Sequence, residues 1–236
     1  MSLKLILFDI DGTLLDVGGS GRWAMTRAFE DVFAIADADP FTRQVRFDGL
    51  TDPGILLEIA SNASVGPVML AARADELRRS FLGHLESRLA ATPTKRVLPG
   101  VVELLDRLAG VSMAQVGLLT GNVQPGARLK LASVGLGDYF DLGGFGEDAG
   151  DRAGVGRVAV QRFEARLKRS IDPGDVIAVG DSLEDIRAAR ANGFRSLAVG
   201  TGWAGHDAIR ALEPDLFVED LTDYGAVMQF IFGTRG

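Results

Sequence analysis

Two carboxylates follow the first apolar run of the chain. Asp9 and Asp11, with Gly12 beside them, come directly after the apolar residues 5–8. A continuous apolar run is typical of a strand buried on both faces, and ligands bind at the carboxyl ends of strands in open α/β sheets. Two neighbouring acids repel each other unless a cation lies between them, so this spacing indicates a metal site and phosphoryl-transfer chemistry. An ordinary Asp-Gly turn that closes a strand is the alternative.

A second group of polar residues ends the apolar run 113–120. It consists of Thr120, Gly121 and Asn122. A hydroxyl and free backbone amides just before a helix could hold phosphate oxygens. A turn followed by a helix cap explains the same tripeptide without any ligand, so this motif alone is a weak indication of a phosphate site.

A third group follows the apolar run 176–180. Asp181 comes at the end of this run, and Asp185 lies about one helical turn further on. Capping by Ser182, with acids favoured in the first turn of a helix, accounts for this pair when it is taken alone. Capping does not account for polar groups at three strand ends in chain order. Together the three groups predict one phosphoryl-transfer site.

Composition narrows the class of protein and the kind of metal. The chain has 236 residues, 47% of them hydrophobic, and its net charge of −7 argues against nucleic acid or an anionic membrane as the main partner. It has no cysteine and two histidines, so a hard, oxygen-ligated metal is favoured. The apolar opening segment is interrupted by Lys4 and Asp9 and lacks a signal-peptide cleavage pattern. We therefore expect a cytoplasmic protein that does not act at a membrane.

Strand-like and helix-like segments alternate over most of the chain. This alternation predicts an α/β fold with a mostly parallel sheet and covering helices. Beyond the first strand, the segments predicted as strands are 113–120, 140–145, 176–180, 196–199 and an edge strand at 215–218. One helix is expected to begin with Pro99 in its first position and to end at Gly110, and a C-terminal helix is expected over 223–232.

The interval 16–96 differs, because it contains successive helix patterns and no convincing strand. Asp52 as the cap and Pro53 in the first turn predict the start of one helix, and Pro67 predicts the start of a longer one that runs to Leu89. Stretches with the composition of linkers flank this block at 18–21 and 91–94. We therefore predict a core domain of residues 1–15 and 97–236, interrupted by an inserted helical cap domain of residues 16–96.

These residues together resemble the motifs of the haloacid-dehalogenase-like hydrolase superfamily, in its phosphoglycolate-phosphatase-like and β-phosphoglucomutase-like branch. The resemblance spans nearly the whole chain. The segments that carry it are Asp9-Ile10-Asp11-Gly12-Thr13 as the first motif, Thr120-Gly121-Asn122 as the second, and Gly180-Asp181-Ser182 through Asp185 as the fourth. It implies a Rossmann-like core sheet under an α-helical cap, with Mg²⁺ as the cofactor. It also implies a phosphatase or phosphomutase, since dehalogenases of this superfamily lack an acid at the position of Asp11.

The third motif of the superfamily is usually a lysine near the start of a helix. No lysine lies between Lys130 and Lys168 in this chain. Arg152 is the preferred replacement, because a guanidinium can hold phosphate with two parallel hydrogen bonds. Arg157, in the first turn of the following helix, is the alternative. A solvated surface arginine is the simpler interpretation of either residue.

In the mechanism that the resemblance implies, Asp9 attacks phosphorus and forms an aspartyl-phosphate. Mg²⁺ would be held by Asp9, the backbone carbonyl of Asp11 and Asp181. Asp11 would also protonate the leaving oxygen and then take a proton from the attacking water. The other implied roles are phosphate binding by Thr120, Gly121, Asn122 and Arg152, and orientation of a metal ligand or metal-bound water by Asp185.

The leading prediction is therefore a Mg²⁺-dependent phosphoric monoester hydrolase that acts on a small phosphorylated metabolite. A sugar-phosphate mutase of the β-phosphoglucomutase type and a catalytically silent protein that binds a phosphate ligand are the alternatives. Relatives that act on phosphoglycolate carry Gly, then Lys or Arg, then Thr and Asp in the cap, whereas this chain has Leu50 in the second position. The missing cation argues against a carboxylated substrate, unless another basic residue of the cap replaces it. The candidates are Arg22, Arg27, Arg43 and Arg46. Neither the substrate nor the oligomeric state follows from the sequence.

Overall fold

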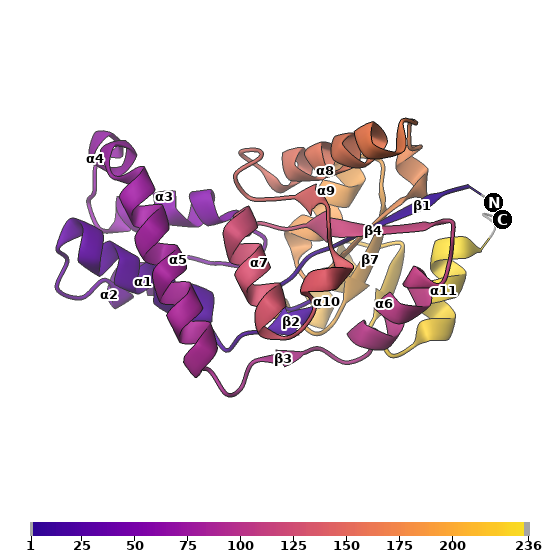
Figure 1. Ribbon diagram of the computed structural model, residues 1–236, viewed down its shortest axis with the longest axis horizontal. Helices are drawn as coiled ribbons and strands as arrows, with labels where there is room; N and C mark the ends of the chain where they lie inside the picture. The colour runs from indigo at the N-terminus through magenta and orange to yellow at the C-terminus, as the bar shows by residue number, and fades with distance from the viewer. Residues whose placement is uncertain (1, 234–236) are drawn as a thin grey trace.

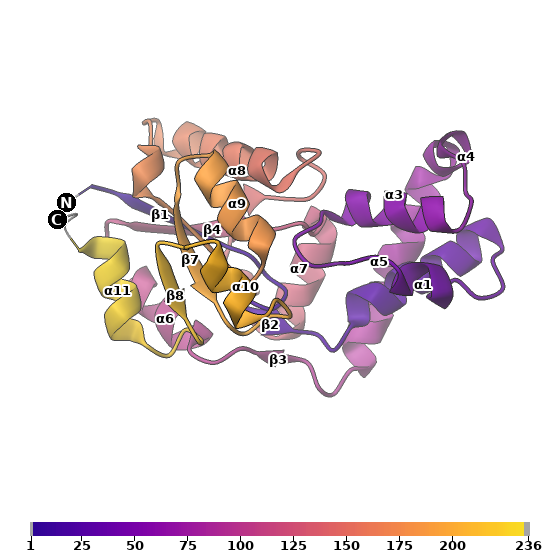
Figure 2. The same ribbon diagram turned by 180° about the vertical axis from the view of Figure 1, so that it is seen from behind.

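A six-stranded parallel sheet forms the centre of the protein, with helices on both faces and a separate helical layer at one end (Figures 1 and 2). The structure is a computed structural model, and it describes residues 2–233. In spatial order the strands are β5 (Gly143–Gly144), β4 (Ala114–Leu119), β1 (Lys4–Phe8), β6 (Val176–Gly180), β7 (Arg195–Val199) and β8 (Leu216–Val218). The predicted α/β fold with a mostly parallel sheet is confirmed, including the edge strand β8.

The three strands that precede the predicted site residues are neighbours in the sheet. β1 pairs in parallel with β4 on one side and with β6 on the other. Phe8 stands level with Leu118 of β4 and Val179 of β6, so these strands end at the same edge. The backbone N–H of Asp9 donates to the carbonyl of Val179 at 2.9 Å, which fixes the start of the loop after β1.

Successive side chains of β1 point to opposite faces of the sheet and pack into two separate hydrophobic clusters. Leu5 and Leu7 pack against α8 (Arg152–Leu167) and α9 (Leu183–Ala191), which lie on one face of the sheet in Figure 1. Ile6 and Phe8 join the larger core on the other face. That face is covered by α6 (Val101–Ala109), α7 (Gln124–Ser133) and α11 (Tyr224–Phe232). The remaining short elements are α10 (His206–Ala211) and the 3₁₀ turns Gly137–Tyr139 and Pro173–Asp175.

The helical layer contains α1 (Ser20–Phe33), α2 (Asp39–Arg43), α3 (Asp52–Asn62), α4 (Pro67–Ala72) and α5 (Ala74–Ala91). Its own apolar core lies mainly between α1 and α5, and α7 packs against α5 from the sheet side. The chain crosses between the two parts at a short antiparallel ribbon of β2 (Leu15–Asp16) and β3 (Arg96–Val97). The domain boundaries 1–15, 16–96 and 97–236 remain a prediction, and this ribbon lies at the crossing.

Several predicted element ends differ from the structure. α6 begins at Val101 after Gly100, so Pro99 precedes the helix because the chain first turns through the left-handed conformation of Gly100. The long helix predicted from Pro67 to Leu89 is two helices, because at Arg73 the backbone bonds back to both Met69 and Leu70 and leaves the α conformation. Of the stretch 18–21, only residues 18 and 19 precede α1, and residue 91 still belongs to α5.

Two further predictions are corrected by the contacts of individual side chains. The cap of α3 is Thr51, whose hydroxyl accepts from the N–H of Gly54 at 3.2 Å, and Asp52 is the first helical residue. The predicted strand 140–145 is reduced to Gly143–Gly144, because Phe140 follows a 3₁₀ turn and packs edge-to-face on Phe8. Among residues 2–233, no helix combines the length and apolar character needed to cross a membrane.

Candidate active site

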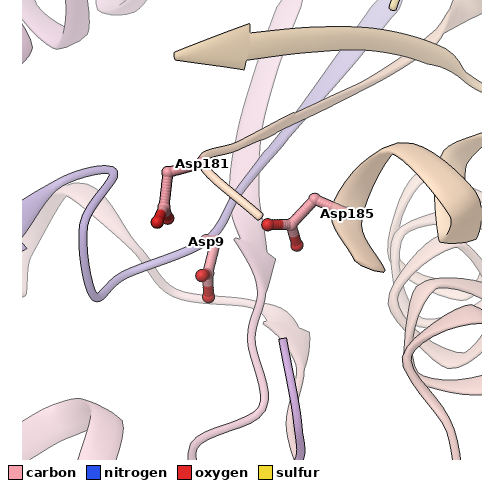
Figure 3. Close-up of side chains that lie close together, drawn as sticks. All are labelled: Asp9, Asp181 and Asp185. Atoms are coloured by element: carbon pink, nitrogen blue, oxygen red, sulfur yellow. The ribbon is translucent and has the colours of Figure 1, made fainter. Parts of the chain in front are cut away.

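Three carboxylates meet at the carboxyl edge of the sheet. Asp9 follows β1, Asp181 follows β6, and Asp185 lies in the first turn of α9. Each offers an oxygen within 4.8 Å of the others, all three side chains are buried, and Figure 3 shows how closely they gather. Asp185 is held by a reciprocal cap, because Ser182 Oγ donates to its carboxylate at 2.7 Å and accepts from its N–H at 3.2 Å.

Arg152 connects two of these carboxylates. As the first residue of α8 it is buried, and its Nη2 lies 2.7 Å from Asp9 Oδ1 and 2.7 Å from Asp185 Oδ1. A second donor, Nε, reaches the same oxygen of Asp185 at 3.0 Å. Arg157, the alternative cation, is exposed on α8 and donates to Asn192 Oδ1 at 3.4 Å. The structure therefore brings Arg152, and not Arg157, to the carboxylate cluster.

Burial and mutual repulsion raise the pKa of two carboxylates of the cluster. Burial raises the pKa of Asp9 to about 6, with Arg152 acting to lower it and the charges of Asp185 and Asp11 acting to raise it. Burial, and then the charges of Asp9 and Asp185, also raise the pKa of Asp181 well above its usual value. For Arg152, burial lowers the pKa, but the two carboxylates more than offset this, so the guanidinium stays charged.

The donor set fits a divalent hard cation. Asp9, Asp181 and Asp185 carry three negative charges when ionised, and Arg152 supplies one positive charge, which leaves two to be neutralised. Carboxylate oxygens are the ligands that Mg²⁺ and similar ions prefer. Asp181 is also fixed in place, because Thr13 Oγ1 donates to its Oδ1 at 2.9 Å. The sequence-based choice of Asp9 and Asp181 as metal ligands is compatible with this geometry.

Asp11 faces a different set of partners. Its Oδ2 accepts from Lys130 Nζ at 2.6 Å and from Asn122 Nδ2 at 2.8 Å. Asn122 is fixed in turn, because its Oδ1 accepts from Lys130 at 2.6 Å and its Nδ2 also donates to Thr120 Oγ1 at 2.9 Å. The carboxylate of Asp11 is thus held by a hydrogen-bonded network beside the cluster of three carboxylates, and Thr120 and Asn122 belong to that network.

Lys130 was not identified as a site residue from the sequence. It lies on α7 with a buried side chain, in line with Ala127 and Leu131 on the apolar face of that helix. The sequence does contain one indication of its role, a lysine on the apolar face of a helix, because a lysine is rarely buried without a polar or charged partner. The partners, Asp11 and Asn122, come from other segments of the chain.

The helical layer contacts the site directly through the segment before α3. The N–H of Asp52 donates to the carbonyl of Gly121 at 2.7 Å, and its Oδ2 accepts from the N–H of Val123 at 2.8 Å. A Cβ atom on Gly121 would lie 2.0 Å from the carbonyl oxygen of Leu50, so only glycine permits this approach. Burial raises the pKa of Asp52 to about 6, and the charge of Lys130 acts to lower it. Asp52 therefore joins the two parts of the protein beside the site, a role that its sequence position did not indicate.

A cavity of about 650 Å³ lies between the sheet edge and the helical layer. Its charged floor is formed by Asp9, Asp11, Lys130, Arg152 and Asp181. The walls come from the segment after β2, from α1, from residues 43–55 of the helical layer and from Trp203. The predicted Arg22, Arg43 and Arg46 line this cavity, whereas Arg27 ion-pairs with Glu30 on α1.

The sheet, the helical layer and the polar groups at three strand ends define a family of hydrolases. The model of that family, the haloacid dehalogenase-like hydrolases, matches residues 3–193, and the chain belongs to this family. It is an enzyme of the phosphatase type within the family, as its motifs predict.

Individual relatives agree with this assignment. The chain is 30% identical to a phosphoglycolate phosphatase of Vibrio vulnificus (strain CMCP6), over 93% of each chain. It is 29% identical to a phosphoglycolate phosphatase of Pectobacterium atrosepticum, over 94% of this chain and 91% of the relative. Among solved structures, CbbY from Rhodobacter sphaeroides, in complex with phosphate, superposes with a TM-score of 0.72 at 17% identity. That alignment covers 94% of this chain and 96% of CbbY.

Proposed function

We propose that the protein hydrolyses small phosphomonoesters through an aspartyl-phosphate on Asp9, with Mg²⁺ as its cofactor. The observation that carries the proposal is the cluster of Asp9, Asp181 and Asp185 around Arg152. Of these residues, Asp9, Asp181 and Arg152 line the floor of the cavity. Uncatalysed phosphate monoester hydrolysis is extremely slow, so the site must both neutralise the phosphoryl group and supply a nucleophile. A carboxylate is such a nucleophile, because it is ionised near neutral pH.

The phosphoryl group would be bound between the cluster and the loop after β4. Arg152 would direct its guanidinium to the phosphoryl oxygens, in addition to the carboxylates that it now holds. The hydroxyl of Thr120 and the backbone amides of Gly121 and Asn122 lie where β4 ends, one strand away from Asp9. Mg²⁺, held by Asp9, Asp181 and the backbone carbonyl of Asp11, with Asp185 beside it, would supply the charge that balances the anions.

Proton transfer falls to Asp11 in this proposal. Asp9 attacks phosphorus, the bond to the leaving oxygen breaks, and Asp11 donates a proton to that oxygen. Asp11 then takes a proton from the water that cleaves the aspartyl-phosphate, which regenerates Asp9 and releases phosphate. Lys130 and Asn122 hold the carboxylate of Asp11 at 2.6 and 2.8 Å, and so fix the direction in which the proton leaves.

Phosphate release by the purified protein tests the proposal. The substrates are p-nitrophenyl phosphate, 2-phosphoglycolate and a set of sugar phosphates, each with Mg²⁺ and with EDTA. 2-Phosphoglycolate is included first because the relatives in Vibrio vulnificus and Pectobacterium atrosepticum are phosphoglycolate phosphatases. Phosphate release that stops with EDTA and returns with Mg²⁺ is expected. A requirement for a sugar bisphosphate activator would favour a mutase, and no release from any substrate would favour a silent phosphate-binding protein.

A further inference from the structure

The cavity is larger than a phosphoryl group requires. Its volume of about 650 Å³ lies within the range of roughly 300–1,000 Å³ that is usual for pockets that hold drug-sized ligands. The phosphoryl group occupies only the floor, beside Asp9 and Arg152. The rest of the space must accommodate the leaving group of the substrate, and the walls of that space decide which leaving groups fit.

The helical layer contributes a group of apolar side chains to the wall of the cavity. They are Met25, Val45, Phe47, Leu50 and Ile55. Apolar walls favour an apolar ligand, because contact with it removes both surfaces from water. A leaving group with an extended hydrocarbon or aromatic portion would therefore bind more strongly than a short polar one.

The cations in this wall already have partners. Arg22 donates to the carbonyl of Val45 at 3.1 Å and stacks 4.0 Å above the ring of Phe47. Arg43 and Arg46 are exposed at the rim and pair with Asp39 and Asp48 respectively. Three aspartates, Asp16, Asp48 and Asp52, line the same side of the cavity as the three arginines. The formal charges of these lining residues therefore cancel, which favours an uncharged leaving group over one with a second anion.

Trp203 provides an aromatic surface from the side of the sheet. Its side chain lines the cavity although 63% of its surface is exposed. The loop that carries it is fixed against the site, because Thr201 Oγ1 donates to the carbonyl of Gly12 at 2.6 Å. A Cβ atom on Gly202 would lie 1.6 Å from Asp181 Oδ2. The backbone next to Trp203 therefore lies directly against the carboxylate of Asp181, a candidate metal ligand. An exposed indole at a cavity, on a loop packed against the site, is typical of a surface that contacts a ligand.

We propose that the substrate is the phosphomonoester of an uncharged alcohol with an extended apolar or aromatic portion, which packs against Trp203 on one side and the apolar side chains of the helical layer on the other. The inference rests on the proposed function, which places the phosphoryl end on the cavity floor. Trp203 is then a residue that determines specificity, and its loss weakens the binding of long leaving groups more than that of short ones. A two-carbon carboxylated substrate such as phosphoglycolate gains little from these walls.

A homologous series of ligands tests this inference separately from catalysis. Ethyl, butyl and hexyl phosphonate share one anionic head group, cannot be hydrolysed, and differ only in apolar length. Their dissociation constants are measured by calorimetry with Mg²⁺ present. We expect the Kd to fall about two- to fourfold for each added methylene in the natural protein, which is the scale of burying one such group. Trp203→Ala should flatten this dependence, Trp203→Phe should retain most of it, and Val68→Ala should leave it unchanged, since Val68 is 83% exposed and lies outside the cavity.

The kinetic arm uses the matching ethyl, butyl and hexyl phosphates together with 2-phosphoglycolate. A kcat/KM that rises along the alkyl series and exceeds that for 2-phosphoglycolate supports the inference. Equal Kd values along the phosphonate series, or a Trp203→Ala variant with an unchanged dependence on length, overturn it while leaving the proposed phosphatase intact. Length-dependent phosphonate binding without any phosphate release would instead overturn the proposed function and leave the assignment of the apolar walls in place.

Discussion

Removal of the Arg152 side chain should disable the site in two measurable ways. Arg152→Ala takes away the donor that we place on the transferred phosphoryl oxygens, and loss of one such donor typically lowers the rate about 10²–10³-fold. It also removes the ion pairs at 2.7 Å to Asp9 and Asp185. The second effect changes the ionisation of the nucleophile, and its size follows from the geometry.

Two unit charges 2.7 Å apart interact by about 6 kcal/mol at an effective dielectric constant near 20, before the cost of burial is subtracted. Even a quarter of that energy corresponds to one pK unit. Burial raises the pKa of Asp9 to about 6 and Arg152 acts to lower it, so removal of Arg152 should raise that pKa further. Asp9 must be ionised to attack phosphorus, so the acid limb of kcat/KM should move upward by about one pH unit or more.

The assay is the pH profile of kcat/KM for p-nitrophenyl phosphate at a fixed Mg²⁺ concentration far below saturation, so that the metal-free carboxylates determine the acid limb. The inhibition constant of inorganic phosphate is measured alongside. Arg157→Ala is the matched control, because Arg157 is an exposed arginine of the same helix. Arg152→Lys should keep part of the rate, since a point charge still neutralises phosphate but loses the second hydrogen bond. A silent Arg152→Ala, or an Arg157→Ala that carries the damage, would refute this reasoning and move the role to Arg157.

Three further predictions follow from the same contacts. Asp11→Asn should lower kcat by roughly 10²-fold or more while Mg²⁺ affinity changes little, as steady-state kinetics against Mg²⁺ concentration can measure. Asp181→Ala should weaken Mg²⁺ activation more than Asp185→Ala, because both oxygens of Asp185 already accept hydrogen bonds, Oδ1 from Arg152 and Oδ2 from Ser182. Calorimetric Mg²⁺ titration of both variants compares them. Asp52→Asn should stabilise the protein above pH 6 by up to about 3 kcal/mol and have no effect below pH 4. Folding raises the pKa of Asp52 from 3.8 to about 6. As the pH rises, Asp52 therefore ionises in the unfolded chain before it ionises in the folded protein, and the folded protein loses stability between these two pH values. Thermal unfolding at pH 4 and pH 8 checks the sign, and greater stabilisation at pH 4 would contradict it.

The sheet was predictable because its strands are buried on both faces. The run 5–8 and the strand Val176–Gly180 read as continuous apolar segments that end at acids, and the structure places both as neighbours at the centre of the sheet. Element ends were less predictable, because they depend on single backbone conformations. The left-handed backbone of Gly100 places the start of α6 after Pro99, and the non-helical backbone of Arg73 separates one expected helix into α4 and α5.

The parts of the site that escaped prediction all depend on contacts between distant segments. Lys130 and Asp11 are 119 residues apart, and only the packing of α7 brings them together. Asp52 meets Val123 across 71 residues, where the helical layer closes on the sheet edge, whereas the local pattern suggested only a helix cap. Arg152 could be predicted from the sequence because it comes soon after the predicted strand 140–145 and close to the start of a helix. The side chains that decide specificity, Trp203 among them, carry no local signal.

Acid-quench mass spectrometry of the protein during turnover tests the central claim most directly. With a good phosphomonoester substrate and Mg²⁺, the peptide that contains Asp9 should gain the mass of one phosphoryl group within the first turnover, and lose it again when the acyl phosphate is hydrolysed. Asp9→Asn should show neither the added mass nor phosphate release, while binding of phosphate persists. Rapid phosphate release by Asp9→Asn, or a phosphoryl group trapped on a residue other than Asp9, would contradict the account.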